Sequence, residues 1–102
     1  TVARVGGDEF VLILPEVDSR ESALAIAEKI QTSLEKPVDI GGKTLSITVS
    51  IGIAFCTRLE KDEELLFRAA DDAMYKAKEL NRRNRKSNII LTDIDRLPDS
   101  LS

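Results

Sequence analysis

Two adjacent acidic residues near the start of the chain follow two glycines, a combination typical of a small catalytic or metal-binding turn. The stretch "RVGGDEFVLIL" places Gly6 and Gly7 before Asp8 and Glu9, and an apolar strand follows at once. Glycines leave backbone N–H groups open to a bulky ligand. Because Mg²⁺ prefers one or two carboxylates together with phosphate oxygens, the turn suits a nucleotide–Mg²⁺ complex. For Gly-Gly-Asp taken alone, an exposed acidic turn without function is the alternative.

A second chemical feature is a basic pair, Lys78 and Arg82, within a helical pattern. Residues four apart share one face of a helix, and two cations there suit a polyphosphate. The alternative is that both charges only complement the negative end of the helix dipole.

The residue types that are missing restrict the chemistry further. The chain has no histidine and a single cysteine, Cys56, which excludes Ser-His-Asp and Cys-His catalysis and ordinary structural zinc. Carboxylates, lysines, arginines and metal ions must then carry any reaction. Cys56 ends an apolar pattern, so we expect it to be a buried hydrophobe. A lone cysteine also fits a reducing compartment, and we expect a cytoplasmic domain.

Length and charge limit the class of protein. The 102 residues suffice for one domain or less, and 42% apolar with 32% charged residues is typical of a globular protein. A net charge of −3 gives no field that attracts nucleic acid or an anionic membrane, so we expect neither partner. No apolar run approaches the roughly 20 residues of a membrane span. The first residue is Thr1, so targeting stays open, and a parent protein can still be membrane-anchored.

The patterning predicts strands and helices in alternation. Residues 2–5 and 10–14 form a hairpin whose turn takes positive φ at Gly6-Gly7. Asp18 then caps a helix that runs to about Lys36, before Pro37. A small hairpin surrounds Gly41-Gly42. From Leu45 to Ile53 bulky residues alternate with small ones, which predicts a strand whose bulky face is buried. The small face includes Gly52 and indicates close packing of a helix.

The rest of the chain predicts one more helix and one more strand. The helix covers 62 to about 80, with Met74 and Tyr75 as packing residues, and the strand covers 88–91. Residues 1–91 would then form the domain portion and 92–102 a polar tail. The fold class expected is α+β, a mostly antiparallel sheet with helices packed on it.

Three stretches together resemble the GGDEF domain, the family of diguanylate cyclases. "RVGGDEF" is similar to its signature, "SITVSIGIA" (46–54) to its second marker strand, and "AADDAMYKAKELNRRN" (69–84) to its last helix. They occur in family order and cover Arg4 to about Leu91. The resemblance implies part of a nucleotidyl-cyclase-like, ferredoxin-like palm domain that lacks its N-terminal strand and helices here. That first strand lies inside the family's sheet. Without it, the neighbouring strands must close the gap, pair with another chain, or leave their edges exposed.

The resemblance implies an enzyme that condenses two GTP molecules into cyclic di-GMP and two pyrophosphates. Two GGDEF domains, a homodimer, face each other, and Mg²⁺ or Mn²⁺ is the cofactor. Gly6 and Gly7 would lie against the nucleotide, Asp8 would bind the metal, and Glu9 would be the adjacent catalytic acid. Lys78 and Arg82 would contact phosphate, although Asn81 replaces the family's glycine and the contact could shift to Arg83. Asn81 can keep the left-handed cap of the helix.

What precedes Thr1 matters for activity under this resemblance. A second metal-binding aspartate, the guanine contacts and the Asp of an inhibitory Arg-x-x-Asp site would lie there, with Arg4 alone remaining beside that site. We therefore expect this chain alone to be inactive. The alternative is a non-catalytic GTP-binding or regulatory GGDEF module. A sensor, receiver or EAL domain is an expected neighbour; the Glu35-Lys36-Pro37 flank of the small hairpin resembles tandem GGDEF–EAL proteins.

Overall fold

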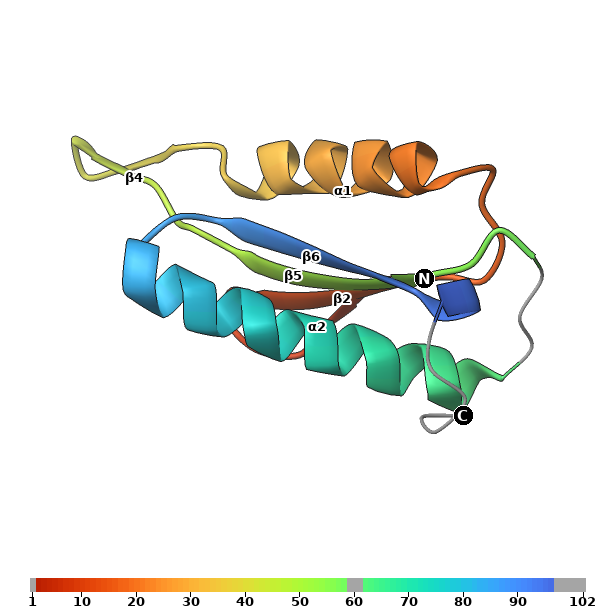
Figure 1. The fold of residues 1–102 in the computed structure, drawn as a ribbon. Coiled ribbons are helices and arrows are strands. Elements are labelled where there is room, and N and C mark those ends of the chain that lie inside the picture. The colour runs from red at the N-terminus through yellow and green to blue at the C-terminus, as the bar shows by residue number, and fades with distance from the viewer. Residues whose placement is uncertain (1, 59–61, 97–102) are drawn as a thin grey trace.

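The computed structural model describes residues 2–58 and 62–96 as six strands, two α-helices and a 3₁₀ turn (Figure 1). In chain order the elements are β1 (Val2–Arg4), β2 (Glu9–Leu14), α1 (Arg20–Leu34), β3 (Val38–Ile40), β4 (Lys43–Leu45), β5 (Ser50–Phe55), α2 (Glu63–Asn84), β6 (Asn88–Asp93) and η1 (Ile94–Arg96). Among the described residues, no helix combines the length and hydropathy of a membrane span.

The main sheet has the order β1-β2-β5-β6, and most of it is parallel. Only β1 and β2 pair antiparallel, with Arg4 opposite Phe10, whereas β2 pairs parallel with β5 and β5 parallel with β6. The prediction of a mostly antiparallel sheet is therefore wrong. α1 and α2 each return the chain to the end of the sheet where it started, so the next strand runs in the same direction as the last. The general expectation of a mixed α and β fold with helices on the sheet holds.

The sheet is covered on both faces, as parallel sheets usually are (Figure 1). One face packs against α1 through the buried set Leu12, Ala23, Ala27, Val49, Ile51, Ile53 and Phe55. The other packs against α2 through Val11, Ala54, Cys56, Leu66, Ala70, Met74 and Ile94. Every residue of β5 is buried, so this central strand connects the two halves of the core. Cys56 is buried as predicted.

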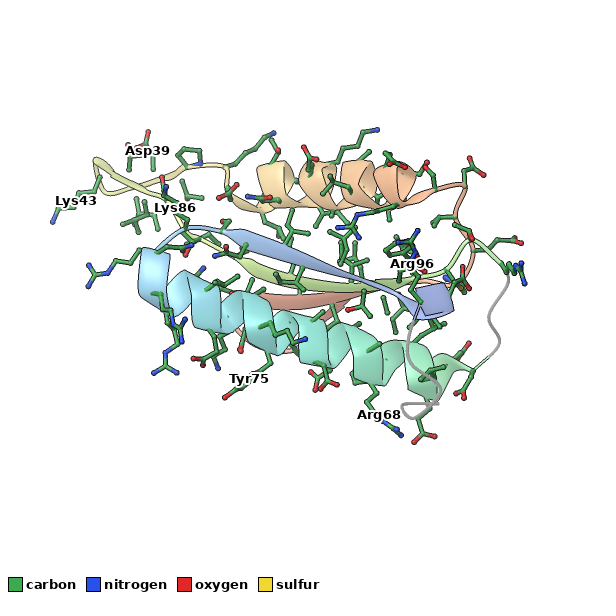
Figure 2. The ribbon with its side chains drawn as sticks, in the orientation of Figure 1. Asp39, Lys43, Arg68, Tyr75, Lys86 and Arg96 are labelled. Carbon is green, nitrogen blue, oxygen red and sulfur yellow. The ribbon has the colours of Figure 1, made fainter. Side chains whose placement is uncertain are left out.

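The long strand predicted from Leu45 to Ile53 is interrupted. β4 ends at Leu45 and pairs with β3 as a separate two-stranded sheet, and β5 starts only at Ser50. Leu45 and Ile47 are each about half exposed, because the hairpin projects from the body of the fold, with Lys43 at its tip (Figures 1 and 2). The alternation therefore predicts burial correctly from Val49 onward and wrongly before it.

The helix ends differ from prediction by a few residues. α1 is capped by Ser19, whose Oγ accepts from the Ser22 N–H, rather than by Asp18. α2 is capped by Asp62 and runs one turn beyond Leu80. The left-handed residue that ends α2 is Arg85, with φ of 56°, so the cap expected at Asn81 is wrong. Asn81 lies inside the helix instead.

The last strand also runs further than predicted, to Asp93, and η1 follows it. Residues 97–102, which make up most of the predicted polar tail, lie outside the described residues. The division into a domain portion at 1–91 and a tail at 92–102 stays a prediction.

Close packing of α2 on β5 depends on Gly52. A Cβ built at Gly52 would overlap the backbone N of Met74 and the carbonyl O of Ala70, which are main-chain atoms that cannot swing away. The predicted role of Gly52 in helix-to-sheet packing is thus confirmed. A side chain here would push the whole helix off the sheet.

We predict that Gly52→Ala lowers the free energy of unfolding by about 3 kcal/mol, because overpacking against a helix backbone forces the helix to shift. Urea unfolding followed by circular dichroism measures this. Gly7→Ala is the matched control, since a Cβ there would meet nothing within 4 Å, and its effect should stay within about 0.5 kcal/mol. Equal stabilities for the two variants would contradict the packing role of Gly52.

Candidate functional site

The turn between β1 and β2 is fixed by backbone hydrogen bonds on both sides. The N–H groups of Val5 and Gly6 donate to the carbonyl of Glu9, at 2.9 and 3.3 Å. The carbonyl of Asp8 accepts from the N–H of Ser50, at 2.9 Å, where β5 begins. The turn is therefore hydrogen-bonded to the central strand β5.

The backbone conformation of the two glycines in this turn differs from the prediction, whereas their place against a nucleotide stays a prediction. Among the described residues, the glycines with positive φ are Gly41 and Gly42, so the positive φ expected at Gly6-Gly7 is wrong. At Gly6 an added Cβ would overlap the carboxylate of Glu9, which folds back over it. At Gly7 an added Cβ would meet nothing within 4 Å. Gly6 thus makes room for a side chain of the turn itself, and Gly7 leaves an open side.

Glu9 joins the turn to α2 through an ion pair with Lys78. Glu9 Oε1 lies 3.0 Å from Lys78 Nζ, and the two side chains are 19% and 44% exposed. The hydrogen bond and the charge of Glu9 raise the pKa of Lys78 above its ordinary value. Two candidate residues 69 positions apart in the sequence thereby meet, which no local pattern predicts.

Arg82 lies one helical turn beyond Lys78, and its positive charge opposes the rise in the pKa of Lys78 that Glu9 causes. Its guanidinium Nη1 is 3.3 Å from Glu79 Oε1 on the same helix. Asp8 is exposed at the turn. The structure thus brings Gly6, Glu9 and Lys78 into one cluster. Asp8 precedes Glu9 in the chain, and Arg82 is one helical turn from Lys78. Tyr75, predicted as a packing residue, is instead exposed on the outer face of α2 (Figure 2).

A contact that sequence reasoning missed holds the end of α2 in place. Thr48 and Asn81 exchange side-chain hydrogen bonds, with Asn81 Nδ2 donating at 3.0 Å and the Thr48 hydroxyl at 3.4 Å. Ser87 reinforces the same region, because its Oγ accepts from the Val49 N–H and donates to a carboxylate oxygen of Glu35. The helix segment that carries Lys78 and Arg82 is therefore fastened to the chain just before β5. The only signal in the sequence was the asparagine at position 81.

The donor set of the turn fits a cation that is shared with a ligand. Asp8 offers an exposed carboxylate beside the open side at Gly7, and Glu9 offers a second one that is occupied by Lys78. Within 2–58 and 62–96, no three His, Cys, Asp or Glu side chains converge as a complete metal site. One or two carboxylates plus phosphate oxygens is how proteins usually hold Mg²⁺.

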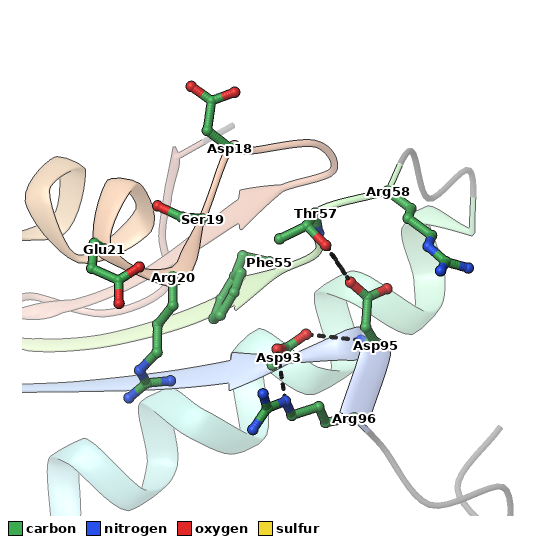
Figure 3. Close-up of a pocket in the computed structure, with 10 residues that line it drawn as sticks. All are labelled: Asp18, Ser19, Arg20, Glu21, Phe55, Thr57, Arg58, Asp93, Asp95 and Arg96. Atoms are coloured by element: carbon green, nitrogen blue, oxygen red, sulfur yellow. Dashed lines mark hydrogen bonds and ion pairs between the residues drawn. The ribbon is translucent and has the colours of Figure 1, made fainter.

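A separate cavity of about 760 Å³ opens at the other end of the sheet, where β5 and β6 finish (Figure 3). It is lined by charged residues of both signs and a few others: Asp18, Ser19, Arg20, Glu21, Phe55, Thr57, Arg58, Asp93, Asp95 and Arg96. The length of β5 separates it from the turn by roughly 17 Å. The cavity therefore belongs to a different part of the surface.

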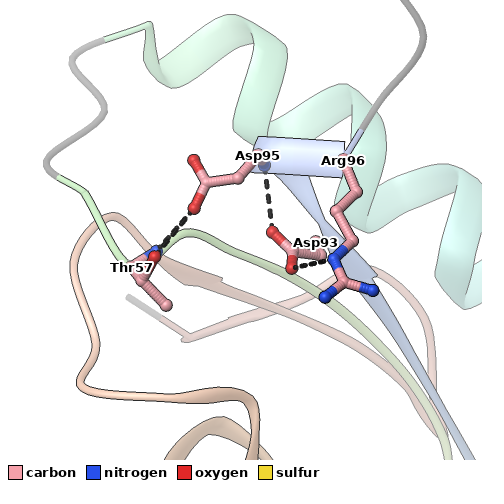
Figure 4. Close-up of polar contacts among 4 residues, drawn as sticks. All are labelled: Thr57, Asp93, Asp95 and Arg96. Carbon is pink, nitrogen blue, oxygen red and sulfur yellow. Dashed lines mark hydrogen bonds and ion pairs between the residues drawn. The ribbon is translucent and has the colours of Figure 1, made fainter.

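The wall of this cavity has a structural role. Asp95 accepts from the N–H and hydroxyl of Thr57, at 3.1 and 2.9 Å, and so connects η1 to the end of β5 (Figure 4). Asp93 accepts from the Asp95 N–H at 3.0 Å and lies 3.6 Å from Arg96 Nε. The carboxylates of Asp93 and Asp95 therefore hold η1 against the ends of β5 and β6.

The turn, the buried central strand and the basic helix face correspond to a known family. The family model described as diguanylate cyclase, GGDEF domain, matches residues 1–96. This chain belongs to the GGDEF domain family.

Relatives support the same assignment. An uncharacterized protein of Mycobacterium tuberculosis is 44% identical over 77 residues, 76% of this chain and 12% of that protein. Diguanylate cyclase TpbB of Pseudomonas aeruginosa is 40% identical over 86 residues, 83% of this chain and 20% of the relative. Diguanylate cyclase DgcM of Escherichia coli is 47% identical over 77 residues, 76% of this chain and 18% of the relative. The chain thus spans a fifth or less of these proteins, and no solved structure matches it significantly.

We predict that Thr48→Val lowers the free energy of unfolding by about 1 kcal/mol, because it leaves the Asn81 amide without its partner. The substitution keeps the β-branched shape, so only the hydroxyl is lost. Thr32→Val, at an exposed position on α1, is the control and should change stability by less than about 0.5 kcal/mol. Urea unfolding of both variants measures the difference; a Thr48→Val protein as stable as the control would show that the pair does not hold α2.

Proposed function

We propose that this chain is the motif-bearing portion of a diguanylate cyclase domain. In the parent protein, meaning the longer protein of which this chain would be a part, the domain condenses two GTP molecules into cyclic di-GMP. Each 3′-hydroxyl attacks the α-phosphate of the other GTP, and two pyrophosphates leave. Two such domains face each other, each presenting one GTP. The observation that carries the proposal is the convergence of the motif turn and the basic face of α2 at the Glu9–Lys78 contact.

Each residue of the cluster has a role that follows from its position. The open side at Gly7 admits the nucleotide close to the backbone, and Gly6 lies beside it. Asp8 would hold Mg²⁺ or Mn²⁺, which when bound neutralises phosphate charge and orients the in-line displacement. Glu9 is the neighbouring catalytic acid. Lys78 and Arg82 contact the phosphates from the helix.

The same family membership supports the remaining parts of the proposal. A second GGDEF domain is the partner required for the reaction, and a sensor, receiver or EAL domain accompanies it in the parent protein. The parent acts in a bacterial signalling pathway, with this domain in the cytoplasm. This chain alone is expected to be inactive with GTP and Mg²⁺, since the resemblance implies that the reaction needs a second metal-binding aspartate and guanine contacts in addition to the residues of this cluster. The inhibitory site also stays a proposal, as the side chain of Arg4 lies outside the described residues.

We predict that Asp8→Ala in the parent protein lowers the rate of cyclic di-GMP synthesis by about a hundredfold or more, because the metal supplies several kcal/mol of charge stabilisation. Chromatographic detection of cyclic di-GMP formed from GTP measures it. Asp72→Ala, an exposed acid on α2, changes the net charge equally and should leave the rate within about twofold. An active Asp8→Ala protein would remove this residue from the metal role.

A second prediction separates the two candidate arginines. Arg82 shares a helix face with Lys78, whereas Arg83 is turned about 100° further around the helix. Arg82→Ala in the parent protein should therefore weaken GTP binding about tenfold, as expected for loss of a charge-assisted phosphate contact. Arg83→Ala should change it less than about twofold. Isothermal titration calorimetry measures both, and the reverse order would assign the phosphate contact to Arg83.

A further inference from the structure

The carboxylate of Glu9 is held from two sides. Its Oε1 lies 3.0 Å from Lys78 Nζ. Its Oε2 occupies the space that a Cβ on Gly6 would need. The side chain is 19% exposed, so it is largely withdrawn from solvent into this position. The absence of a side chain at Gly6 is therefore what allows Glu9 to reach Lys78.

In this arrangement the positive charge of Lys78 is neutralised by a carboxylate of the protein itself. An ammonium paired with a carboxylate at 3.0 Å presents little net charge to a third group. Lys78 is 44% exposed, so an incoming anion can still reach it. A phosphate that binds Lys78 must therefore compete with the carboxylate of Glu9.

We propose that Glu9, in addition to its proposed role beside the metal, acts as a positioning residue before the nucleotide binds: it holds Lys78 in the ligand-free protein and yields it to phosphate when the nucleotide arrives. The inference rests on the proposed function and adds a step to it: Lys78 exchanges a carboxylate partner for a phosphate partner. Gly6 supports the ligand-free state, because its bare Cα provides the place where the carboxylate lies. A purely structural ion pair would instead only stabilise the fold.

The ion pair itself is tested by NMR of the lysine ammonium groups in this chain. The Lys78 ammonium signal should shift in Glu9→Gln, because its partner loses its charge. Gly6→Ala should give a similar shift, because the new methyl displaces the carboxylate. Gly7→Ala is the matched control and should leave the signal unchanged. Circular dichroism melts confirm that each variant is folded. A Lys78 signal unmoved in Glu9→Gln would overturn the proposal at once.

The exchange is tested by GTP titration of the parent protein in EDTA, so that no metal contributes. Glu9→Gln should bind GTP about tenfold more tightly than the unsubstituted protein, since phosphate no longer displaces a carboxylate. In the Lys78→Met background, Glu9→Gln should bring no gain. Persistence of the gain without Lys78 would show a general charge effect, and equal or weaker binding by Glu9→Gln would show a structural pair; either overturns the proposal.

A titration of the unsubstituted parent protein with GTP and Mg²⁺ separates this inference from the proposed function. Failure of GTP to bind under these conditions would contradict the proposed function, and the inference with it. If the unsubstituted protein binds GTP with Mg²⁺, but Glu9→Gln does not bind GTP more tightly in EDTA, the proposed partner exchange of Lys78 is overturned and the proposed function is not.

Discussion

The close contact between β5 and α2 at Gly52 determines where the candidate site residues lie. Because position 52 has no side chain, the backbone of α2 rests directly on the central strand. The inner face of the helix carries small residues as well, with Ala70, Ala73 and Ala77 buried. A helix seated this low brings Lys78 within reach of Glu9 at the start of the neighbouring strand. A bulkier contact at position 52 would separate the two by moving the helix.

The register between β2 and β5 is the second constraint on the site. Glu9 lies opposite Ser50, and the Asp8 carbonyl bonds to the Ser50 N–H. A slip of one residue would send the side chain of Glu9 to the α1 face of the sheet. Register is strongly specified here because β5 is buried on both faces, so any slip would also misplace its core side chains. The buried core therefore fixes the orientation of a partly exposed acid.

The sequence predicts the local elements well and their assembly less well. Strong apolar patterns, caps and Gly-Gly turns indicated both helices, both hairpins and the packing role of Gly52. Strand direction is not encoded locally, and the parallel pairing of β2 with β5 follows only from α1 acting as a crossover. Aliphatic alternation also predicted burial of Leu45 and Ile47, although the β3–β4 hairpin projects away from the core. The motif identified the turn. The Glu9–Lys78 contact depends on tertiary packing, so no local sequence pattern could predict it.

The most direct test of the account is paramagnetic NMR with Mn²⁺ and GTP on the parent protein, with amide signals of this chain assigned. If the turn holds a cation shared with the nucleotide, Mn²⁺ should broaden the amides of Gly6, Gly7 and Asp8 first, and those near Lys78 next. Selective broadening around Glu21 and Asp95, in the cavity at the other end of β5 roughly 17 Å away, would contradict the account. That result would place the cation at the wrong end of the sheet.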